Sequence, residues 1–372
     1  MANVAITAGF APSLVNFRGP LIDRLLQRGH VVHALAPPAD DATLRWLNER
    51  GIRFTAVPLF RVGTSMFEDL RTFCSLKSAF RTIKPDVTIA YTVKPVVYGT
   101  LAAAAVGVPR RYAMITGLGY AFMDPQSSLK RKSINLAVRA LYKLSLSRVH
   151  GVIFQNPDDL AEFEHLNLLP TRPPTTIVNG SGVDVTHFSP TPYPDQLRFV
   201  MIARLVADKG IGEYVAAARI LKAQYPDVQC DIVGPTDPNP AAITLGIVER
   251  AVADGVIRYH GELADVRPAL ARASVYVLPS YREGTPRSVL EAMAMARPII
   301  TTDAPGCRET VVEGHNGFLV PIRDAKALTE AMRRFVVQPS LIAKLGANSR
   351  LRAVEKYEAG NVADTVVAAC GL

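Results

Sequence analysis

The chain of 372 residues is too long for one ordinary hydrophobic core, so we expect two domains of about 150–200 residues each. Hydrophobic residues make up 49% of the sequence, which argues against an intrinsically disordered protein. The net charge of +9 is uneven, because residues 1–190 carry 21 Lys/Arg against 13 Asp/Glu (+8) and the remainder carries 21 against 20 (+1). The amino-terminal half is therefore expected to meet an acidic partner.

The four cysteines lie far apart with no CxxC pair, which argues for a reducing compartment and against a disulfide framework or a zinc site. The amino-terminal residues lack the pattern of a signal peptide. No window reaches the roughly 18 uncharged apolar residues that a membrane span requires. The sequence therefore predicts a cytoplasmic protein.

Short apolar runs alternate with helical patterns from the first residues onward. Residues 3–7 are expected to form the first strand, and a glycine-containing turn then leads to a helix that Pro20 opens and Gly29 ends. Further strands are predicted at residues 31–35, 87–91, 111–116, 151–155 and 176–179. This alternation is typical of parallel βαβ units.

The same order repeats after residue 197. A second set of strands is predicted at residues 198–203, 228–233, 256–259, 275–278 and 299–302. Residues 186–196, with three prolines in five positions, are interpreted as a semi-rigid linker between two domains. The sequence thus predicts an α/β protein of two Rossmann-like, doubly wound domains, residues 1–188 and 189–354, that face each other across a cleft. In such domains ligands bind beyond the carboxyl ends of the strands.

The stretch VLPSYREGTPRSVLEAMAMARPIITTDAPGCRE, residues 277–309, places several charges between two apolar strands. We expect Thr285 to cap a helix that starts at Pro286 and continues to about residue 296. The first amides of this helix, near Arg287 and Ser288, have no intrahelical acceptor and attract phosphate oxygens.

Two glutamates flank that helix start. Glu283 precedes the helix and Glu291 lies within it, about 8 Å further along the axis. We expect them to bracket a diphosphate, with one carboxylate reaching sugar hydroxyls and the other reaching ribose hydroxyls. The alternative is a pair of solvated charges near a helix start. Apolar neighbours on both sides of Glu291 favour the functional interpretation, because a buried carboxylate costs several kcal/mol, roughly, unless it is partnered.

EGTPRSVLE, residues 283–291, resembles the E-x7-E motif of the retaining glycosyltransferases of family 4, which have the GT-B fold. The residues that follow resemble the same family's LEAMA-x-G-x-P…GG-x-x-E run, with Ala296 and Pro305 where glycine is usual. NFRGPLIDRL, TGLGYAF, LYKLSLSRVHGVIFQN, SGVDVTHFSP and MIARLVADKG are similar to the bacterial subgroup that extends undecaprenyl-diphosphate-linked saccharides. The resemblance implies that residues 355–372 cross back onto the first domain.

The stretch MIARLVADKG is similar to the family pattern R-(L/V)-x-x-x-K-G, which implies that Arg204 and Lys209 approach the donor diphosphate. Two cations beyond a strand end neutralise the charge of a departing diphosphate, although a solvated loop is the alternative. With Glu283, these two residues are the predicted catalytic set. The predicted donor-binding residues are Glu291, Gly284, Thr285, Pro286, Arg287 and Gly9, together with Gly234, His260 and Gly261 in two loops where the family reads the nucleobase.

The acceptor is expected in the first domain. By resemblance and position, the predicted acceptor-binding residues are Arg18, Lys94, Thr116, Gly117 and Tyr120. Arg18 is equally consistent with a solvent-facing residue at a helix start, and Lys94 with an ordinary surface lysine. Many family members have a histidine near residues 116–122 that contacts the transferred sugar, and this sequence has none there.

Residues 129–148, LKRKSINLAVRALYKLSLSR, combine an apolar helical face with six positive charges and no acid. This composition predicts a helix that lies on an anionic membrane surface, although an ordinary amphipathic helix packed on its sheet is the alternative. Nucleic acid is not expected, because aromatic residues are not interleaved with the basic ones. The predicted membrane-contacting residues are Lys130, Arg131, Lys132, Arg139 and Lys143.

No D-x-D sequence and no histidine spacing suited to a metal occur, so neither a metal nor another cofactor is expected. The resemblance implies transfer of a hexose or N-acetylhexosamine from a nucleotide sugar, with UDP favoured, to a lipid-diphosphate-linked saccharide in surface polysaccharide or glycan assembly. The protein is then expected on the inner face of the cytoplasmic membrane. The alternatives are a UDP-sugar epimerase of the same architecture and a non-catalytic glycan- or lipid-binding protein.

Overall fold

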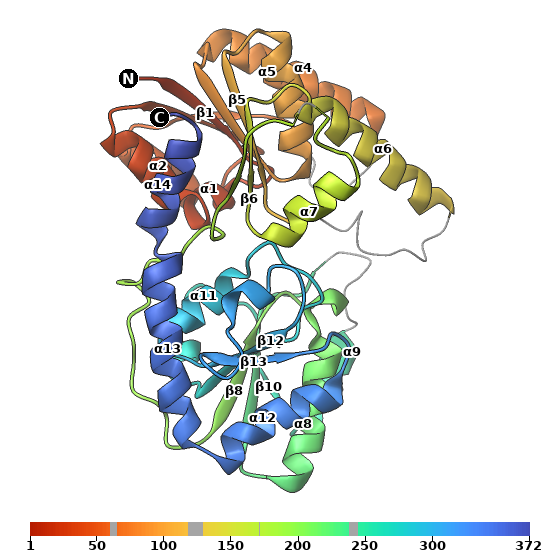
Figure 1. Ribbon diagram of the computed structural model, residues 1–372, viewed down its shortest axis with the longest axis vertical. Coiled ribbons are helices and arrows are strands. Elements are labelled where there is room, and N and C mark those ends of the chain that lie inside the picture. The colour runs from red at the N-terminus through yellow and green to blue at the C-terminus, as the bar shows by residue number, and fades with distance from the viewer. Residues whose placement is uncertain (60–64, 118–128, 171, 238–244) are drawn as a thin grey trace. The chain divides into compact units, whose positions relative to one another are not determined.

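The computed structural model describes residues 1–59, 65–117, 129–170, 172–237 and 245–372, with the backbone alone for residues 129–134 and 245. The chain forms two compact units (Figure 1). Unit 1 comprises Met1–Ser181 and Gly360–Leu372, and unit 2 comprises Gly182–Ala359. Each unit contains a parallel sheet with helices, so the predicted α/β class with two doubly wound Rossmann-like domains is confirmed.

The sheet of unit 1 has, among the described residues, the strand order β3-β2-β1-β4-β5-β6-β7. Because the order reverses between β1 and β4, the ligand-binding switch point of this sheet lies between those two strands. The strands are β1 (Asn3–Thr7), β2 (Val31–Ala36), β3 (Arg53–Ala56), β4 (Val87–Tyr91), β5 (Arg110–Ile115), β6 (Gly151–Phe154) and β7 (Thr175–Ile177). The helices are α1 (Pro12–Asn16), α2 (Gly19–Gln27), α3 (Asp41–Glu49), α4 (Met66–Ile83), the π-helical turn η1 (Pro95–Gly99), α5 (Thr100–Ala105), α6 (Leu129–Leu146), α7 (Pro157–His165) and α14 (Ala359–Ala369).

The sheet of unit 2 repeats the scheme in the order β10-β9-β8-β11-β12-β13, so its switch point lies between β8 and β11. The strands are β8 (Arg198–Ile202), β9 (Gln229–Val233), β10 (Arg258–Tyr259), β11 (Val275–Leu278), β12 (Ile299–Thr302) and β13 (Gly317–Val320). The helices are η3 (Ala207–Lys209), α8 (Ile211–Gln224), α9 (Leu245–Ala253), α10 (Arg267–Ala271), α11 (Arg287–Ala294), η4 (Arg308–Thr310), α12 (Ala325–Val337) and α13 (Ser340–Tyr357).

The central strands are almost entirely buried, which is why they stand out in the sequence as continuous apolar runs. The elements that sequence analysis missed lack that signal. Strand β3, RFTA, is an edge strand with no fully buried residue, and β13, GFLV, is the edge strand of the other sheet and begins with a glycine. Helix α1 occupies five residues of the predicted glycine-containing turn.

The proline-rich residues 186–196 lie inside unit 2 and are docked on it. The guanidinium of Arg297, whose side chain is fully buried, donates to the Thr191 carbonyl oxygen (3.2 Å), the Thr191 hydroxyl (2.5 Å) and the Pro192 carbonyl oxygen (3.2 Å). The Tyr193 hydroxyl donates to the Ala296 carbonyl oxygen (2.8 Å). A segment that composition alone presents as a spacer is therefore held by the end of α11 and the residues after it.

The carboxyl-terminal residues belong to unit 1. Val362, Val366 and Val367 of α14 pack into the core of the first sheet. The guanidinium of Arg28 lies 2.8 Å from Asp364 and donates to the Leu372 carbonyl oxygen (3.0 Å). Among the described residues, no helix has the length and apolar character that crossing a membrane requires.

Candidate active site

The loops after β8 and β11 are fastened to each other at the switch point of unit 2. The Tyr281 amide and the Ser280 hydroxyl both donate to the Asp208 carbonyl oxygen, at 2.8 and 3.1 Å. Gly210 has φ 75°, and a Cβ there would collide with the Pro279 carbonyl oxygen. Glycine is therefore required at this position, and the close approach places Lys209 against the loop that carries Glu283.

Lys209 and Glu283, both predicted as catalytic, form an ion pair between Nζ and Oε1. Their side chains are only 16% and 14% exposed. The Glu283 amide donates to the Pro305 carbonyl oxygen (2.9 Å), and Gly306, at φ 77°, leaves no room for a Cβ beside the Glu283 carbonyl. The backbone on both sides of the carboxylate is thus fixed, so the ion pair is preorganised.

Helix α11 begins one residue later than expected. Its first residue is Arg287, Pro286 is the N-cap, and the helix ends at Ala294. Thr285 does not cap it, because its hydroxyl donates to the Gly284 carbonyl oxygen (3.0 Å) and no side chain caps this helix. The prediction of a Thr285 cap was therefore wrong. An N-cap residue must be extended, and here Pro286 takes that backbone conformation (φ −73°, ψ 109°).

Glu291 is buried on α11, with 8% of its surface exposed. Its partner is Arg287, one turn earlier, whose Nε donates to Oε1 at 2.8 Å. Burial raises the pKa of the Glu291 carboxyl above its usual range, and the Arg287 guanidinium partly opposes that rise. A buried carboxylate with a single cationic neighbour retains acceptor capacity for the hydroxyls of a ligand.

One residue that sequence analysis did not single out, Tyr276, supports the start of α11. The Tyr276 hydroxyl, on β11, donates to the Ile202 carbonyl oxygen (3.2 Å) and is hydrogen-bonded to the Ser288 hydroxyl (2.6 Å). Burial raises the pKa of Tyr276 far above its usual range, so the phenol stays neutral. A tyrosine in the otherwise aliphatic strand VYVL was the available signal, because a buried hydroxyl needs a partner.

Arg204 follows β8 and pairs with a residue that was not predicted. Its guanidinium forms an ion pair with Asp237 in the loop after β9, with side-chain exposures of 44% and 12%. Gly234, at φ 144°, leaves no room for a Cβ beside the Ala203 carbonyl, which brings that loop against the end of β8. Both predicted diphosphate-binding cations are therefore paired with carboxylates.

The predicted nucleobase loops after β9 and β10 meet through backbone contacts. The Gly234 amide donates to the Gly261 carbonyl oxygen (2.7 Å), and the Tyr259 hydroxyl donates to the Gly234 carbonyl oxygen (2.8 Å). His260 is separate from them, with Nε2 3.5 Å from the carboxylate of Asp231. These contacts bring Gly234 and Gly261 together and direct His260 toward the strand.

Among the residues that the structure describes, those predicted in unit 1 do not form a comparable charged cluster. Arg18 is 4% exposed and lies over the ring of Tyr91, with its guanidinium carbon 4.7 Å from the ring centroid. It also donates to the Ser181 hydroxyl (3.1 Å), so it is not the solvent-facing arginine that sequence analysis kept as an alternative. Burial raises the pKa of Tyr91 to about 12.

The other described residues of unit 1 lie at the ends of β1, β4 and β5. Gly9 lies beside Thr92, and a Cβ there would come within 2.8 Å of the threonine hydroxyl. Lys94 Nζ is paired with Asp69 at 2.8 Å. Thr116 and Gly117 directly follow β5 and are half-buried. Tyr120 lies outside the described residues.

The predicted membrane-contacting residues fall on α6. The side chains of Lys130, Arg131 and Lys132 lie outside the described residues. Arg139 is half-buried and Lys143 is exposed, so the described part of the helix presents some positive charge to solvent.

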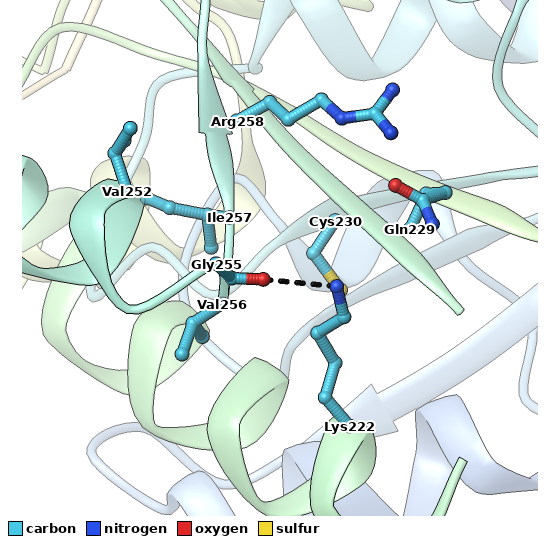
Figure 2. A pocket seen from close by; sticks show the side chains of 8 residues that line it. All are labelled: Lys222, Gln229, Cys230, Val252, Gly255, Val256, Ile257 and Arg258. Atoms are coloured by element: carbon cyan, nitrogen blue, oxygen red, sulfur yellow. Dashed lines mark hydrogen bonds between the residues drawn. The ribbon is translucent and has the colours of Figure 1, made fainter. Parts of the chain in front are cut away.

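A pocket of about 350 Å³ lies at the opposite end of the unit 2 sheet, where β9 and β10 begin. Figure 2 shows Lys222 at its edge, with Nζ donating to the Gly255 carbonyl oxygen at 3.0 Å. Gln229 and Arg258 open these two strands, so the pocket is at their amino ends and separate from the predicted donor residues. Within the described part of the chain, no three His, Cys, Asp or Glu side chains are grouped closely enough to hold a metal ion.

Both units match known families. Residues 18–180 match the family described as "Glycosyl transferase 4-like domain", and residues 196–338 match "Glycosyl transferases group 1". A Campylobacter jejuni protein named N,N'-diacetylbacillosaminyl-diphospho-undecaprenol alpha-1,3-N-acetylgalactosaminyltransferase is 27% identical over 93% of this chain and 92% of its own. The Staphylococcus aureus capsular polysaccharide biosynthesis glycosyltransferase CapM is 25% identical over 81% of this chain and 80% of its own.

Solved structures agree in fold. The sucrose-phosphate synthase of Thermosynechococcus elongatus has a TM-score of 0.82 at 19% identity, over 98% of this chain and 97% of its own. The Anabaena protein HepE, solved in complex with UDP, has a TM-score of 0.78 at 16% identity, over the full length of both chains. With one family match in each unit, this chain belongs to the glycosyltransferases of group 1 and the family 4-like type, has the GT-B fold and is a glycosyltransferase.

Proposed function

We propose that the chain is a retaining glycosyltransferase that moves a hexose or N-acetylhexosamine from a UDP-linked sugar to a lipid-diphosphate-linked saccharide in polysaccharide or glycan assembly. The observation that carries this proposal is the convergence of Lys209, Glu283, Arg287 and Glu291 around the start of α11. The acceptor and the alpha linkage in the name of the Campylobacter relative support the acceptor class and retention, since an alpha product from an alpha-linked donor retains the configuration. The UDP complex of HepE supports the choice of nucleotide.

The proposed donor site lies in unit 2. Lys209 and Arg204 neutralise the charge that develops on the departing diphosphate, and Glu283 binds hydroxyls of the transferred sugar. Glu291 accepts from the ribose hydroxyls, because a carboxylate can accept from two vicinal hydroxyls at once. Gly284, Thr285, Pro286 and Arg287 form the wall at the helix start, and the loops of Gly234, His260 and Gly261 face the base.

The proposed acceptor site lies in unit 1, at Thr116 and Gly117. Arg18 and Lys94 hold the loops beside it through their contacts with Tyr91 and Asp69. Gly9, beside Thr92, keeps its predicted role toward the donor. In this mechanism the acceptor hydroxyl attacks the face from which the diphosphate leaves, so no protein nucleophile is required. Helix α6 brings unit 1 to an anionic membrane surface, where a lipid-linked acceptor is found.

The test is a transfer assay with the full chain, a panel of UDP- and GDP-sugars and a short-chain lipid-diphosphate-linked monosaccharide. We expect product with a UDP-sugar, and retention of the anomeric configuration in its NMR coupling constants. Incubation with the donor alone separates an epimerase, which would change the sugar, from a transferase, which at most hydrolyses it slowly.

Two further outcomes would contradict the proposal. If Glu291→Gln left transfer intact, the interpretation of the second glutamate as a ligand of the ribose would fail. If transfer stopped in EDTA and returned with manganese, the two cations would not be the charge-neutralising groups.

A further inference from the structure

The start of α4 presents a compact group of exposed apolar side chains. Phe67 is 88% exposed and Met66 is 84% exposed, and among the described residues only Met1 is a more exposed large apolar residue. Leu70, one turn further along the same helix, is 60% exposed. We name Met66, Phe67 and Leu70 the α4 tip. Single exposed apolar residues are ordinary on protein surfaces, but three on adjacent turns of one helix mark a contact surface.

The α4 tip is part of a well-anchored helix. The Ser65 hydroxyl accepts from the Glu68 amide (3.5 Å) and caps the helix. Asp69, on the first turn, accepts from Lys94 Nζ at 2.8 Å and from the Tyr98 hydroxyl at 2.7 Å. These bonds tie the inner face of α4 to η1, and the apolar residues are left on the outer face.

The fully exposed charged residue next to the α4 tip is a cation, Arg71. Arg71 and Arg81 are the exposed charged residues of α4, whereas Glu68 is half-buried and Asp69 is engaged by Lys94. The whole of unit 1 carries 21 Lys/Arg against 13 Asp/Glu, or +8. An apolar tip beside a cation, on a unit of net positive charge, matches the boundary of an anionic bilayer, where acyl chains lie below negative headgroups.

Helix α6 presents a second exposed apolar face in the same unit. Leu136 is 70% exposed and Leu144 is 48% exposed, and a spacing of eight residues places them on one side of the helix. Helix α5 contacts both α4 and α6, and the three helices lie together in unit 1 (Figure 1). Tyr98 packs against the cores beneath both α4 and α6. The two exposed faces therefore belong to one layer of helices.

We propose that the α4 tip inserts into the acyl region of an anionic membrane and is the apolar anchor of unit 1. This inference rests on the proposed function, because a lipid-linked acceptor requires the enzyme at a bilayer. A second copy of the chain fits less well, because a symmetric contact would bring Arg71 of each copy close to the other. A protein partner would require a far larger surface than three side chains, on the order of 20–30 residues on each side.

The chain carries a native position for a reporter. Cys74 is exposed on α4, seven residues after Phe67 and so on the same side of the helix, whereas the other three cysteines are buried. Burial raises the pKa of each of those three thiols to about 12, so a thiol-reactive dye labels Cys74 selectively. We expect the emission of a polarity-sensitive dye at Cys74 to shift to the blue with phosphatidylglycerol-containing vesicles but not with pure phosphatidylcholine vesicles.

The decisive measurement is vesicle co-sedimentation of the triple variant Met66→Ser, Phe67→Ser, Leu70→Ser. We expect about a tenfold or greater loss of binding to anionic vesicles, because the apolar anchor is gone while the charge is unchanged. The matched control is Val337→Ser with Leu351→Ser, two exposed apolar residues of unit 2 (64% and 52%), which should bind as the wild type does. Unchanged binding of the triple variant, an equal loss in the control, or a wild-type dimer that the triple variant abolishes would each overturn the proposal.

A separate measurement distinguishes this inference from the proposed function. With a short-chain acceptor that is soluble in water, the triple variant should transfer sugar as fast as the wild type. If the wild type transferred nothing to that acceptor but vesicle binding still depended on the α4 tip, the proposed function would fail and the membrane anchor would stand. If the wild type transferred sugar to that acceptor but vesicle binding did not depend on the α4 tip, the proposed function would stand and the membrane anchor would fail.

Discussion

The carboxyl ends of the two sheets differ in how they hold their charges. In unit 2, each predicted cation pairs with a carboxylate from another element or turn: Lys209 with Glu283, Arg204 with Asp237 and Arg287 with Glu291. In unit 1, Arg18 lies over Tyr91, and Lys94 pairs with the first turn of α4. The ion pairs of unit 2 suit cations that exchange a carboxylate partner for a diphosphate, whereas the contacts of Arg18 and Lys94 stabilise unit 1 itself.

The difference follows from how each site is distributed along the chain. Most of the unit 2 site comes from one strand, one loop and the first turns of one helix, residues 275–291, so its spacing is visible in a single stretch of sequence. The corresponding end of unit 1 is assembled from the ends of β1, β4 and β5, which lie far apart in the sequence. Pairing there depends on tertiary structure that local spacing does not encode.

The largest effect is expected at Lys209. Lys209→Met removes the cation held at the start of α11, and we expect kcat/KM to fall by about 10²–10³-fold, the range typical for loss of one preorganised charge-stabilising group. The matched control is Lys222→Met, which removes a lysine at the opposite end of the same sheet, beside the pocket in Figure 2. Equal losses in the two variants, measured by initial rates with saturating acceptor, would mean that the pair with Glu283 has no special role.

The next effect tests the backbone around Glu283. Gly306→Ala introduces a Cβ into the Glu283 carbonyl at φ 77°, and we expect at least about a tenfold rise in KM for the donor, since such strain costs about 1–3 kcal/mol. Gly314→Ala is the control, because Gly314 has φ 70° but open space around its Cβ position. In unit 1, Gly9→Ala meets only the end of the Thr92 side chain and should change KM less. If Gly9→Ala raised KM more than Gly306→Ala and Gly314→Ala did, the proposed contrast between the donor site of unit 2 and the strand ends of unit 1 would be wrong.

A smaller effect, with a defined pH dependence, is expected at the buried carboxylate. Arg287→Leu leaves Glu291 buried without its cation, and we expect the free energy of unfolding to fall by about 2 kcal/mol at neutral pH. Burial already raises the pKa of Glu291, and loss of Arg287 raises it further. A carboxyl whose pKa is higher in the folded state contributes stability below its unfolded-state pKa, and that stability is lost as the pH rises through its folded-state pKa. The stability difference between Arg287→Leu and the wild type should therefore become smaller toward acid pH.

Urea unfolding at several pH values measures this difference. The control is Arg333→Leu, which breaks an exposed pair with Glu330 one turn away on α12. Because solvent already screens that pair, its loss should leave stability nearly unchanged at every pH. A constant deficit of Arg287→Leu across pH would show that the arginine acts by packing and not through the carboxylate.

Much of the fold could be predicted because buried parallel strands are apolar along their whole length. Strands β1, β4, β11 and β12 lie where the sequence predicted them, with the same first and last residues. Glu291 was singled out because a carboxylate between apolar neighbours is costly without a ligand or partner. Glu283 and Lys209 were singled out by their places before α11 and after β8 and by the family resemblance. The family resemblance also drew attention to Ala296, which takes φ 61°, a conformation that favours the glycine usual at that position.

The rest depended on contacts between distant segments. Asp237 was missed as the partner of Arg204, and Asp69 as the partner of Lys94, because no local sequence pattern links the two members of either pair. Thr92 takes φ 69°, which no pattern predicts for a β-branched residue. The proline-rich segment 186–196 appeared to be a spacer because its composition does not reveal the buried guanidinium of Arg297 that holds it.

The smallest expected effect concerns Asp237. Its carboxylate competes with a diphosphate for Arg204, so Asp237→Asn should tighten UDP binding slightly, by roughly twofold to fivefold, the range of a partly exposed ion pair. Because the Arg204 side chain is 44% exposed, salt should weaken its pair with Asp237, and the gain in UDP affinity over the wild type should shrink as ionic strength rises.

Asp254→Asn, which breaks an exposed pair with Arg219 in unit 2, is the control for a general change in charge. Titration calorimetry with UDP at two salt concentrations separates the outcomes: a gain shared by both variants would reflect net charge alone. Weaker binding in Asp237→Asn would instead mean that Asp237 orients Arg204 for the diphosphate and does not compete with it.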